Sequence, residues 1–177
     1  FDYKPAPLHV SDNGHTETVP YPPGSLMHVG SATYELQQVH FHRPSEELID
    51  GKSFAMVAHL VHKDAEGRLA VVAVLSEEGA RNPALAEVFG HFPAQPGKEE
   101  APAGARFDAA ALLPSSTAYF TFEGSLTTPP CSEGVTWFVL RTPVTASAEQ
   151  MEAFARHYAH NARPAQPLGG RTIRASG

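Results

Sequence analysis

The chain has 177 residues, which suits one domain spanning residues 1–177, and 42% of them are hydrophobic. This is enough apolar material for a core, which argues against wholesale disorder. Nineteen acidic against thirteen basic residues give a formal net charge of −6. Because the basic residues do not cluster, no nucleic-acid partner is expected. The most apolar run, residues 69–75, is only strand-sized, so no membrane partner is expected either.

The first three quarters of the chain are predicted to be rich in β-strands. Asp50-Gly51 is a turn signal between two of the expected strands, so that pair is predicted to lie antiparallel. Dense or alternating β-type residues predict strands at residues 7–10, 15–19, 33–42, 54–63, 68–76, 118–123 and 135–141.

Helical patterns are few and short. Residues 83–89 are predicted to form a helix, and the Pro- and Gly-rich residues 93–104 a surface loop. Residues 147–150 fit a capping box, and the tail from Pro164 is too rich in Pro and Gly for regular structure. The apolar face of the capped helix is predicted to consist of Met151, Phe154, Ala155 and Tyr158. The expected fold is mainly β (α+β), a single domain with a central twisted, largely antiparallel sheet and small peripheral helices.

Three of the ten histidines have informative positions. His40 and His42 alternate along a predicted strand, so their imidazoles share one face. The hairpin that turns at Asp50-Gly51 brings His59 alongside them, whereas His62 points to the opposite face. Three imidazoles that converge in this way are the ligands of a catalytic zinc ion with one position open to water. The alternative is that the His-x-His pair is simply two polar residues on one side of a sheet.

Residues 124–137 form a second unusual segment. Pro129-Pro130 indicates a rigid loop between two strands, which could include a cis peptide bond. Such a loop could hold the Thr127 hydroxyl where it accepts a hydrogen bond from a hydroxide and donates its own proton to a carboxylate. Glu46 is the natural candidate for that carboxylate. Cys131 is the only cysteine, so it has no disulfide partner within the chain.

These segments resemble the α-class carbonic anhydrases, in particular the exported bacterial members. The similarity is strongest over residues 39–46, 59–62, 124–137 and 161–168, in that order, and a weaker likeness covers nearly the whole chain. The resemblance implies reversible hydration of carbon dioxide to bicarbonate and a proton, by attack of hydroxide activated at Zn(2+). It also implies carbon dioxide and bicarbonate as partners, and anions and sulfonamides as inhibitors that bind at the zinc.

The resemblance further implies a role for each matching residue. His40, His42 and His59 correspond to the zinc ligands, and Glu46 and Thr127 to the pair that orients the hydroxide. His15 corresponds to the proton shuttle, a role suited to an imidazole near neutral pH. Gln38 and the Asn161 backbone carbonyl correspond to hydrogen-bond partners of His40 and His42. The expected substrate cavity consists of Val61, Val71, Leu126, Thr127, Thr128, Val135 and Trp137; without the resemblance, its apolar members would be assigned to ordinary core packing.

The sequence also departs from the family pattern. Val57 stands where the family usually has a glutamate that hydrogen-bonds the third ligand, here His59. Loss of such a partner typically costs about 10 to 100-fold in metal affinity or activity. Glu47 replaces a common family histidine beside Glu46. The family also has roughly fifty more residues before the position of Phe1, including a cysteine that pairs with the Cys131 position. The chain is therefore expected to be a truncated form.

Three functional interpretations follow. The first is an active carbonic anhydrase. The second is a carbonic-anhydrase-like binding module with weak zinc affinity and little activity, which Val57 and the short N-terminus favour. The third, a zinc hydrolase of another class, would require a His-Glu-x-x-His motif, which the sequence lacks. The resemblance and Cys131 predict a periplasmic or secreted protein, and the sequence leaves a homodimer open.

Overall fold

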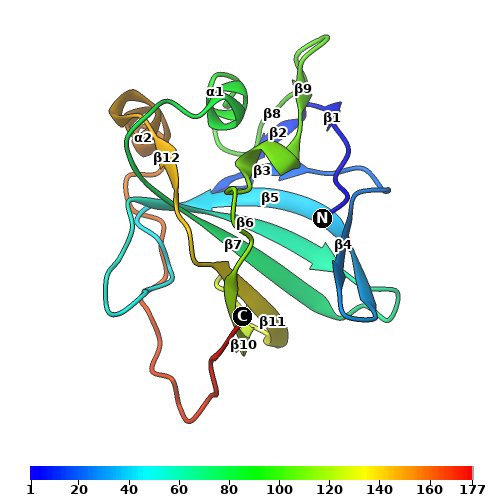
Figure 1. Ribbon diagram of the computed structural model, residues 1–177. Helices are drawn as coiled ribbons and strands as arrows, with labels where there is room; N and C mark the ends of the chain where they lie inside the picture. The colour runs from blue at the N-terminus through cyan, green and yellow to red at the C-terminus, as the bar shows by residue number, and fades with distance from the viewer. Residues whose placement is uncertain (177) are drawn as a thin grey trace.

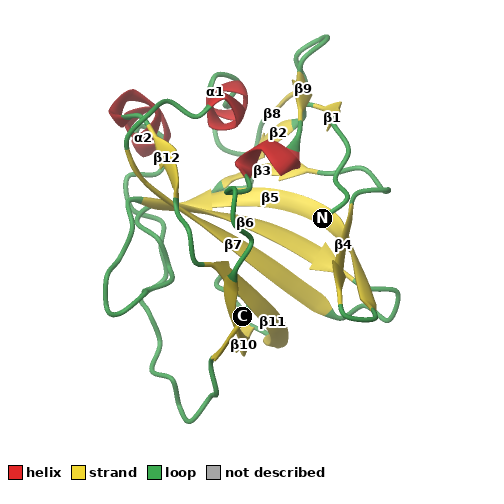
Figure 2. Ribbon diagram, in the orientation of Figure 1, coloured by secondary structure: helices red, strands yellow, loops and turns green. Residues whose placement is uncertain are grey.

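The structure, a computed structural model that describes residues 1–176, consists mostly of β-strands (Figures 1 and 2). The strands are β1 (Ala6–Pro7), β2 (Val10–Asp12), β3 (Glu17–Pro20), β4 (Leu26–Val29), β5 (Ala32–His42), β6 (Met56–Lys63), β7 (Leu69–Glu78), β8 (Glu99–Glu100), β9 (Arg106–Phe107), β10 (Tyr119–Ser125), β11 (Glu133–Leu140), β12 (Val144–Ala146) and β13 (Arg174–Ala175). The helices are α1 (Pro83–Phe89), the 3₁₀ turn η1 (Ala109–Leu112) and α2 (Ala148–Ala155).

One large sheet of 11 strands organises the fold. Its main path runs β13-β10-β11-β7-β6-β5-β3-β2-β8, while β4 pairs with β5 and β12 pairs with β7. Most neighbours are antiparallel, but β11 and β12 both run parallel to β7. The predicted hairpin is confirmed, because β5 and β6 are antiparallel with His40 directly opposite His59. The mainly β architecture expected from the sequence is therefore confirmed.

The two faces of the sheet carry different clusters. In β6, Ala58 and Leu60 belong to the larger core cluster, whereas Val57 and Val61 belong to a second, smaller one. Because side chains alternate along a strand, His59 lies on the face of the second cluster. Helices α1 and α2 contribute to the larger cluster and pack together on its side of the sheet (Figure 1). The other face of the central strands therefore carries the three histidines.

The two predicted helices are present. Helix α1 has the predicted bounds and is capped by the Asn82 side chain, and α2 begins with the predicted capping box of Ser147 and Gln150. Met151 and Phe154 are buried as expected, but α2 ends at Ala155, so Tyr158 packs against the core from the segment that follows. Neither helix in the described part of the chain is long and apolar enough to cross a membrane.

Several short strands differ from the prediction. The segment 7–10 is not one strand but is divided between β1 and β2, and β4 and β12 were not predicted. Strand β8 lies in the predicted loop 93–104, and β13 lies in the tail that was expected to be irregular. Strands of two to four residues are too short to show a period of two. They form because an adjacent strand edge offers backbone partners, as β10 does for β13.

A buried acidic residue lies at the edge of the larger cluster. Glu17 of β3 is completely buried and opposes Asp12 of β2. The imidazole of His157 approaches it, with Nδ1 at 3.1 Å from Glu17 Oε1, and the hydroxyl of Tyr158 donates to Asp12. Burial, together with the charge of Asp12, raises the pKa of Glu17 to about 8. Glu17 therefore favours its protonated form in the folded protein.

This arrangement predicts a pH-dependent stability. Between the ordinary carboxyl pKa of 4.5 and the folded value of about 8, the folded state holds a proton that the unfolded state releases. The free energy of unfolding should therefore fall as pH rises through that range, and Glu17→Gln should flatten the fall. Urea unfolding at a series of pH values tests this. His157→Gln removes a group able to stabilise the charged form of Glu17, so the free energy of unfolding should decrease more steeply with pH in this variant. Identical pH profiles for all three proteins would contradict the prediction.

Candidate active site

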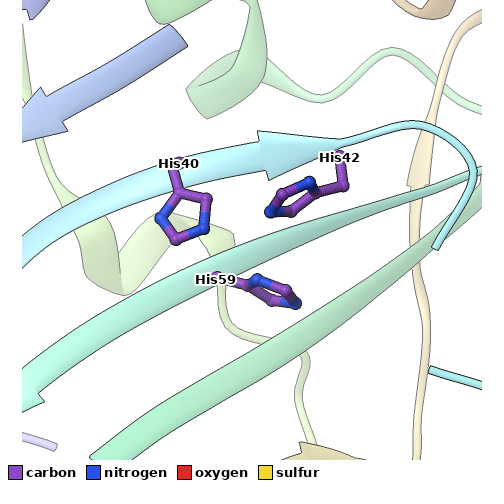
Figure 3. Close-up of side chains that lie close together, drawn as sticks. All are labelled: His40, His42 and His59. Atoms are coloured by element: carbon purple, nitrogen blue, oxygen red, sulfur yellow. The ribbon is translucent and has the colours of Figure 1, made fainter. Parts of the chain in front are cut away.

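Three histidines converge between two neighbouring strands. His40 and His42 lie near the end of β5 and His59 lies in β6, and one ring nitrogen of each is within 4.8 Å of the other two. Figure 3 shows the three imidazoles facing a shared space. His42 and His59 are buried, and His40 is half-buried. Strand alternation and the β5–β6 register produce this arrangement, as the sequence predicted.

The outer nitrogen of each imidazole meets a different acceptor. His40 Nδ1 lies 2.9 Å from Gln38 Oε1, and His42 Nδ1 lies 3.2 Å from the Asn161 backbone oxygen. His59 Nε2 lies 2.7 Å from Glu47 Oε1. These acceptors leave Nε2 of His40, Nε2 of His42 and Nδ1 of His59 as the three inward atoms.

The inward atoms fit a zinc ion. His42 Nε2 is buried and has no hydrogen-bond partner among the described residues, which is a costly state for a polar atom without a ligand. Three imidazole nitrogens form the donor set of a catalytic zinc site, and outer acceptors that fix the tautomers are part of such sites. The histidine triad is therefore consistent with a zinc site.

Burial and neighbouring charges set the protonation of the triad. Burial lowers the pKa of His40 well below its usual value and lowers that of His42 to about 3, so both imidazoles are neutral at neutral pH. Burial also acts to lower the pKa of His59, but the Glu47 carboxylate outweighs it through its charge and its hydrogen bond, so the pKa is raised. His59 therefore differs from the other two in that a carboxylate hydrogen bond outweighs the effect of burial on its pKa.

Glu46 lies between the triad and the residues that follow α2. Its Oε1 accepts a hydrogen bond of 2.6 Å from the Arg163 backbone N–H and lies 3.3 Å from His42 Nδ1. Burial raises the pKa of this carboxyl, although His59, the Arg163 N–H and the Thr127 hydroxyl each act to lower it. The predicted partners Glu46 and Thr127 are therefore neighbours in the structure, although 81 positions separate them along the chain.

Asn161 connects the triad to the loop that carries His15. Besides the contact of its carbonyl with His42, its Oδ1 accepts from the Arg43 N–H at 2.9 Å. Its Nδ2 donates at 3.0 Å to the backbone oxygens of both Phe41 and His15. The His15 residue itself is exposed. Asn161 thus fixes the end of β5 and the backbone of His15 in one network.

The apolar residues predicted to form the substrate wall belong to one cluster on the triad's side of the sheet, and of these only Trp137 lines the adjacent cavity; their role as a wall stays a prediction. The Trp137 ring centroid lies 4.9 Å from that of His59, and Leu126 packs against the cluster that Trp137 belongs to. The other predicted wall residues, Val61, Val71 and Val135, are buried in the same cluster. Thr128 is half-buried in the 124–137 loop, where its carbonyl accepts from the Cys131 N–H, and its role stays a prediction.

A cavity of about 500 Å³ reaches this side of the sheet. Its lining includes Glu46, Glu47, Thr127, Trp137, Arg163 and residues of the tail that begins at Pro164. In Figure 1 the loop after β5 and the orange tail lie next to each other, in agreement with the Arg163–Glu46 hydrogen bond. The cavity is mostly apolar but has three carboxylates at its wall, those of Glu46, Glu47 and Asp50.

One expectation from the sequence needs correction. Val57 led us to expect that His59 lacks a side-chain partner, but Glu47 provides one. The acidic residue beside Glu46 was the available signal, yet its reach to His59 depends on the path of the loop after β5. In the 124–137 loop, the Pro129–Pro130 peptide bond is cis, and Cys131 is free and half-exposed.

Fold and site together define a class: a mainly β metalloprotein whose three-histidine zinc site lies on the face of a large mixed sheet. The family model of the eukaryotic-type carbonic anhydrases matches residues 1–177. The chain is 49% identical over 168 residues to a carbonic anhydrase of Pectobacterium carotovorum, a match that covers 93% of this chain and 67% of that protein. The chain therefore spans about two thirds of the length of this relative.

Solved structures agree with this result. A hyperthermostable carbonic anhydrase from a hydrothermal vent chimney superposes with a TM-score of 0.93 at 40% identity, covering 99% of this chain and 79% of that one. The α-carbonic anhydrase of Thermovibrio ammonificans, in complex with the inhibitor sulfanilamide, superposes with a TM-score of 0.90 at 40% identity, covering 97% and 74%. The chain belongs to the eukaryotic-type, or α-class, carbonic anhydrase family, and among the relatives compared the identity is higher to the Pectobacterium proteins than to those of Arabidopsis thaliana and Mus musculus.

Proposed function

We propose that this chain binds zinc through His40, His42 and His59 and catalyses the reversible hydration of carbon dioxide to bicarbonate and a proton. The observation that carries the proposal is the triad itself, with three inward nitrogens and an acceptor on each outer nitrogen. Zinc held by three histidines lowers the pKa of a bound water to about 7, an established value for carbonic anhydrases, and so supplies a nucleophile at neutral pH.

Thr127 and Glu46 would orient that nucleophile. A hydroxyl that donates its proton to a carboxylate has only acceptor capacity left on its oxygen. Thr127, held by Glu46 in this way, accepts a hydrogen bond from the attacking oxygen. The free lone pair of that oxygen is thereby directed at the substrate. The Arg163 N–H, which holds Glu46 Oε1, and the position of Glu46 and Thr127 in the lining of one cavity support this role.

The apolar surface suits a small apolar substrate. Carbon dioxide has no charge for a cationic side chain to bind, so a desolvated apolar wall is the appropriate site. The clustering of Val61, Val71 and Trp137 on the triad's side of the sheet supports this assignment. Leu126 and Val135 extend the wall, and Thr127 and Thr128 supply polar groups at its edge.

The proton released by hydration must leave the site. His15 is exposed, so it can exchange protons with buffer, and an imidazole can do so near neutral pH. The hydrogen bond from Asn161 to its carbonyl supports a fixed position for its loop. Gln38 and Asn161 keep His40 and His42 in the tautomer that exposes Nε2 to the metal.

The alternative interpretation, a binding module with weak zinc affinity, is less well supported once the partner of His59 is known. Val57 and the short N-terminus favoured it, and Glu47 supplies the acceptor that Val57 cannot. We also propose that the protein functions in the periplasm or outside the cell; the support is the sequence resemblance to exported bacterial members, which implies a disulfide at the Cys131 position. A homodimer is compatible with this proposal.

A metal-dependence experiment tests the function. The purified chain would be stripped with a chelator, reloaded with one equivalent of zinc, and assayed by stopped-flow hydration of carbon dioxide. We expect rapid hydration only after reloading, and inhibition by sulfanilamide, which a Thermovibrio ammonificans relative binds as an inhibitor. A folded, zinc-loaded sample with no rate above that of buffer would overturn the enzyme proposal and favour the binding module.

A further inference from the structure

Glu47 occupies an unusual position for a charged residue. It lies in the loop after β5, yet its side chain is only 9% exposed. Its Oε1 is 2.7 Å from His59 Nε2, while its Oε2 is buried without a hydrogen-bond partner among the described residues. Burying a carboxylate is costly unless a charged or strongly polar partner compensates. Here the partner that compensates is the outer nitrogen of His59.

His59 depends on this contact more than the other two ligands depend on theirs. Its inward atom is Nδ1, so the ring proton must lie on Nε2 and needs an acceptor there. His40 and His42 meet neutral acceptors, an amide oxygen and a backbone carbonyl. His59 meets a carboxylate at 2.7 Å, the shortest of the three contacts, whereas the carboxylate near His42, Glu46 Oε1, lies 3.3 Å from Nδ1 and already accepts from the Arg163 N–H. A carboxylate fixes the tautomer and increases the basicity of the ligand more strongly than a neutral oxygen does.

No acceptor comes from the strand that carries His59. Val57 lies two residues earlier on the same face of β6 and is 1% exposed, packed in the second apolar cluster. Its side chain cannot accept a hydrogen bond. An acceptor at this position would lie on β6, whereas the acceptor actually present reaches His59 from the loop after β5. Glu47 therefore supplies to His59 the hydrogen-bond acceptor that Val57 cannot supply.

We propose that Glu47 is the positioning residue that holds His59 for the metal, in place of a carboxylate on β6. The inference rests on the proposed zinc site and extends it to a residue outside the ligand set. Glu47 does not touch the metal in this account. It acts through His59 by fixing which nitrogen faces inward and by restraining the rotation of the ring.

Zinc retention measures this role directly and does not depend on turnover. The rate of zinc transfer to a chromogenic chelator and the zinc affinity by competition would be measured for wild type and variants. Glu47→Leu should weaken affinity about 10 to 100-fold and speed zinc release, because the outer partner is lost. Glu47→Gln keeps an acceptor oxygen but not the charge, so a smaller loss is expected. The visible spectrum of the Co(2+)-substituted protein should change in Glu47→Leu.

Two further variants separate positioning from general effects. Asp50→Asn removes an acidic group from the lining of the same cavity without touching His59, so it should leave zinc release unchanged. In the Glu47→Leu background, Val57→Glu introduces a carboxylate on β6 next to His59 and should restore slow release of zinc. Thermal unfolding of each apo variant shows whether it is folded.

The outcomes distinguish this inference from the proposed function. Wild-type zinc binding with faster release in Glu47→Leu, an intermediate effect in Glu47→Gln and no effect in Asp50→Asn supports it, with rescue by Val57→Glu as further support. Equal release from wild type and folded Glu47→Leu or Glu47→Gln overturns the role of Glu47 while leaving the zinc enzyme intact. Failure of the wild type itself to bind zinc overturns the proposed function, and this inference with it.

Discussion

Replacing His42 with alanine should abolish zinc binding and carbon dioxide hydration together. The variant loses the buried Nε2 atom that has no other partner, and two remaining imidazoles are too few for a catalytic zinc site. Bound zinc would be measured by mass spectrometry after dialysis, and hydration by stopped flow. Far-ultraviolet circular dichroism would establish that the variant is folded.

A matched histidine variant provides the control. His28 is exposed and its Nδ1 contacts only the Thr33 hydroxyl among the described hydrogen bonds, so His28→Ala should keep one equivalent of zinc and full activity. If folded His42→Ala retained one equivalent of zinc and a normal rate, the metal would have to bind elsewhere. The triad would then no longer explain the chemistry.

Thr127→Val should lower kcat/KM by about 10² to 10³-fold while leaving the zinc content unchanged. Removing one group that orients or stabilises the reacting oxygen typically has this effect. Valine has nearly the same shape as threonine, so the loop should keep its conformation. It cannot donate to Glu46 or accept from the attacking oxygen, so the nucleophile loses its preferred orientation.

Thr136→Val is a matched control for this variant. Thr136 also donates to a glutamate, Glu123 Oε1 at 2.9 Å, but this pair is exposed on β10 and β11. Its replacement should change neither activity nor zinc content, although both variants remove a Thr–Glu contact. A rate for Thr127→Val within about threefold of wild type, well below the effect expected for an orienting group, would contradict the assigned role.

Local patterns in the sequence were sufficient to bring the three histidines together, and the family resemblance then assigned them as metal ligands. A period of two puts His40 and His42 on one face of a strand, and the Asp50-Gly51 turn makes the next strand antiparallel, so His59 lies opposite His40. The capping box of α2 and the bounds of α1 were predictable for the same reason. In each case the determining interactions lie within a few residues or across a single turn.

Contacts between distant segments required the tertiary structure. Strand β13 exists only because β10 offers it a free edge, and Glu17 meets His157 only because the segment after α2 returns to β3. The local pattern shows an acidic residue beside Glu46, but it does not indicate that the Glu47 carboxylate reaches His59, because that contact depends on the path of a loop. The sequence by itself therefore determined the ligands and the class of the protein, while the tertiary structure decided which carboxylate supports His59.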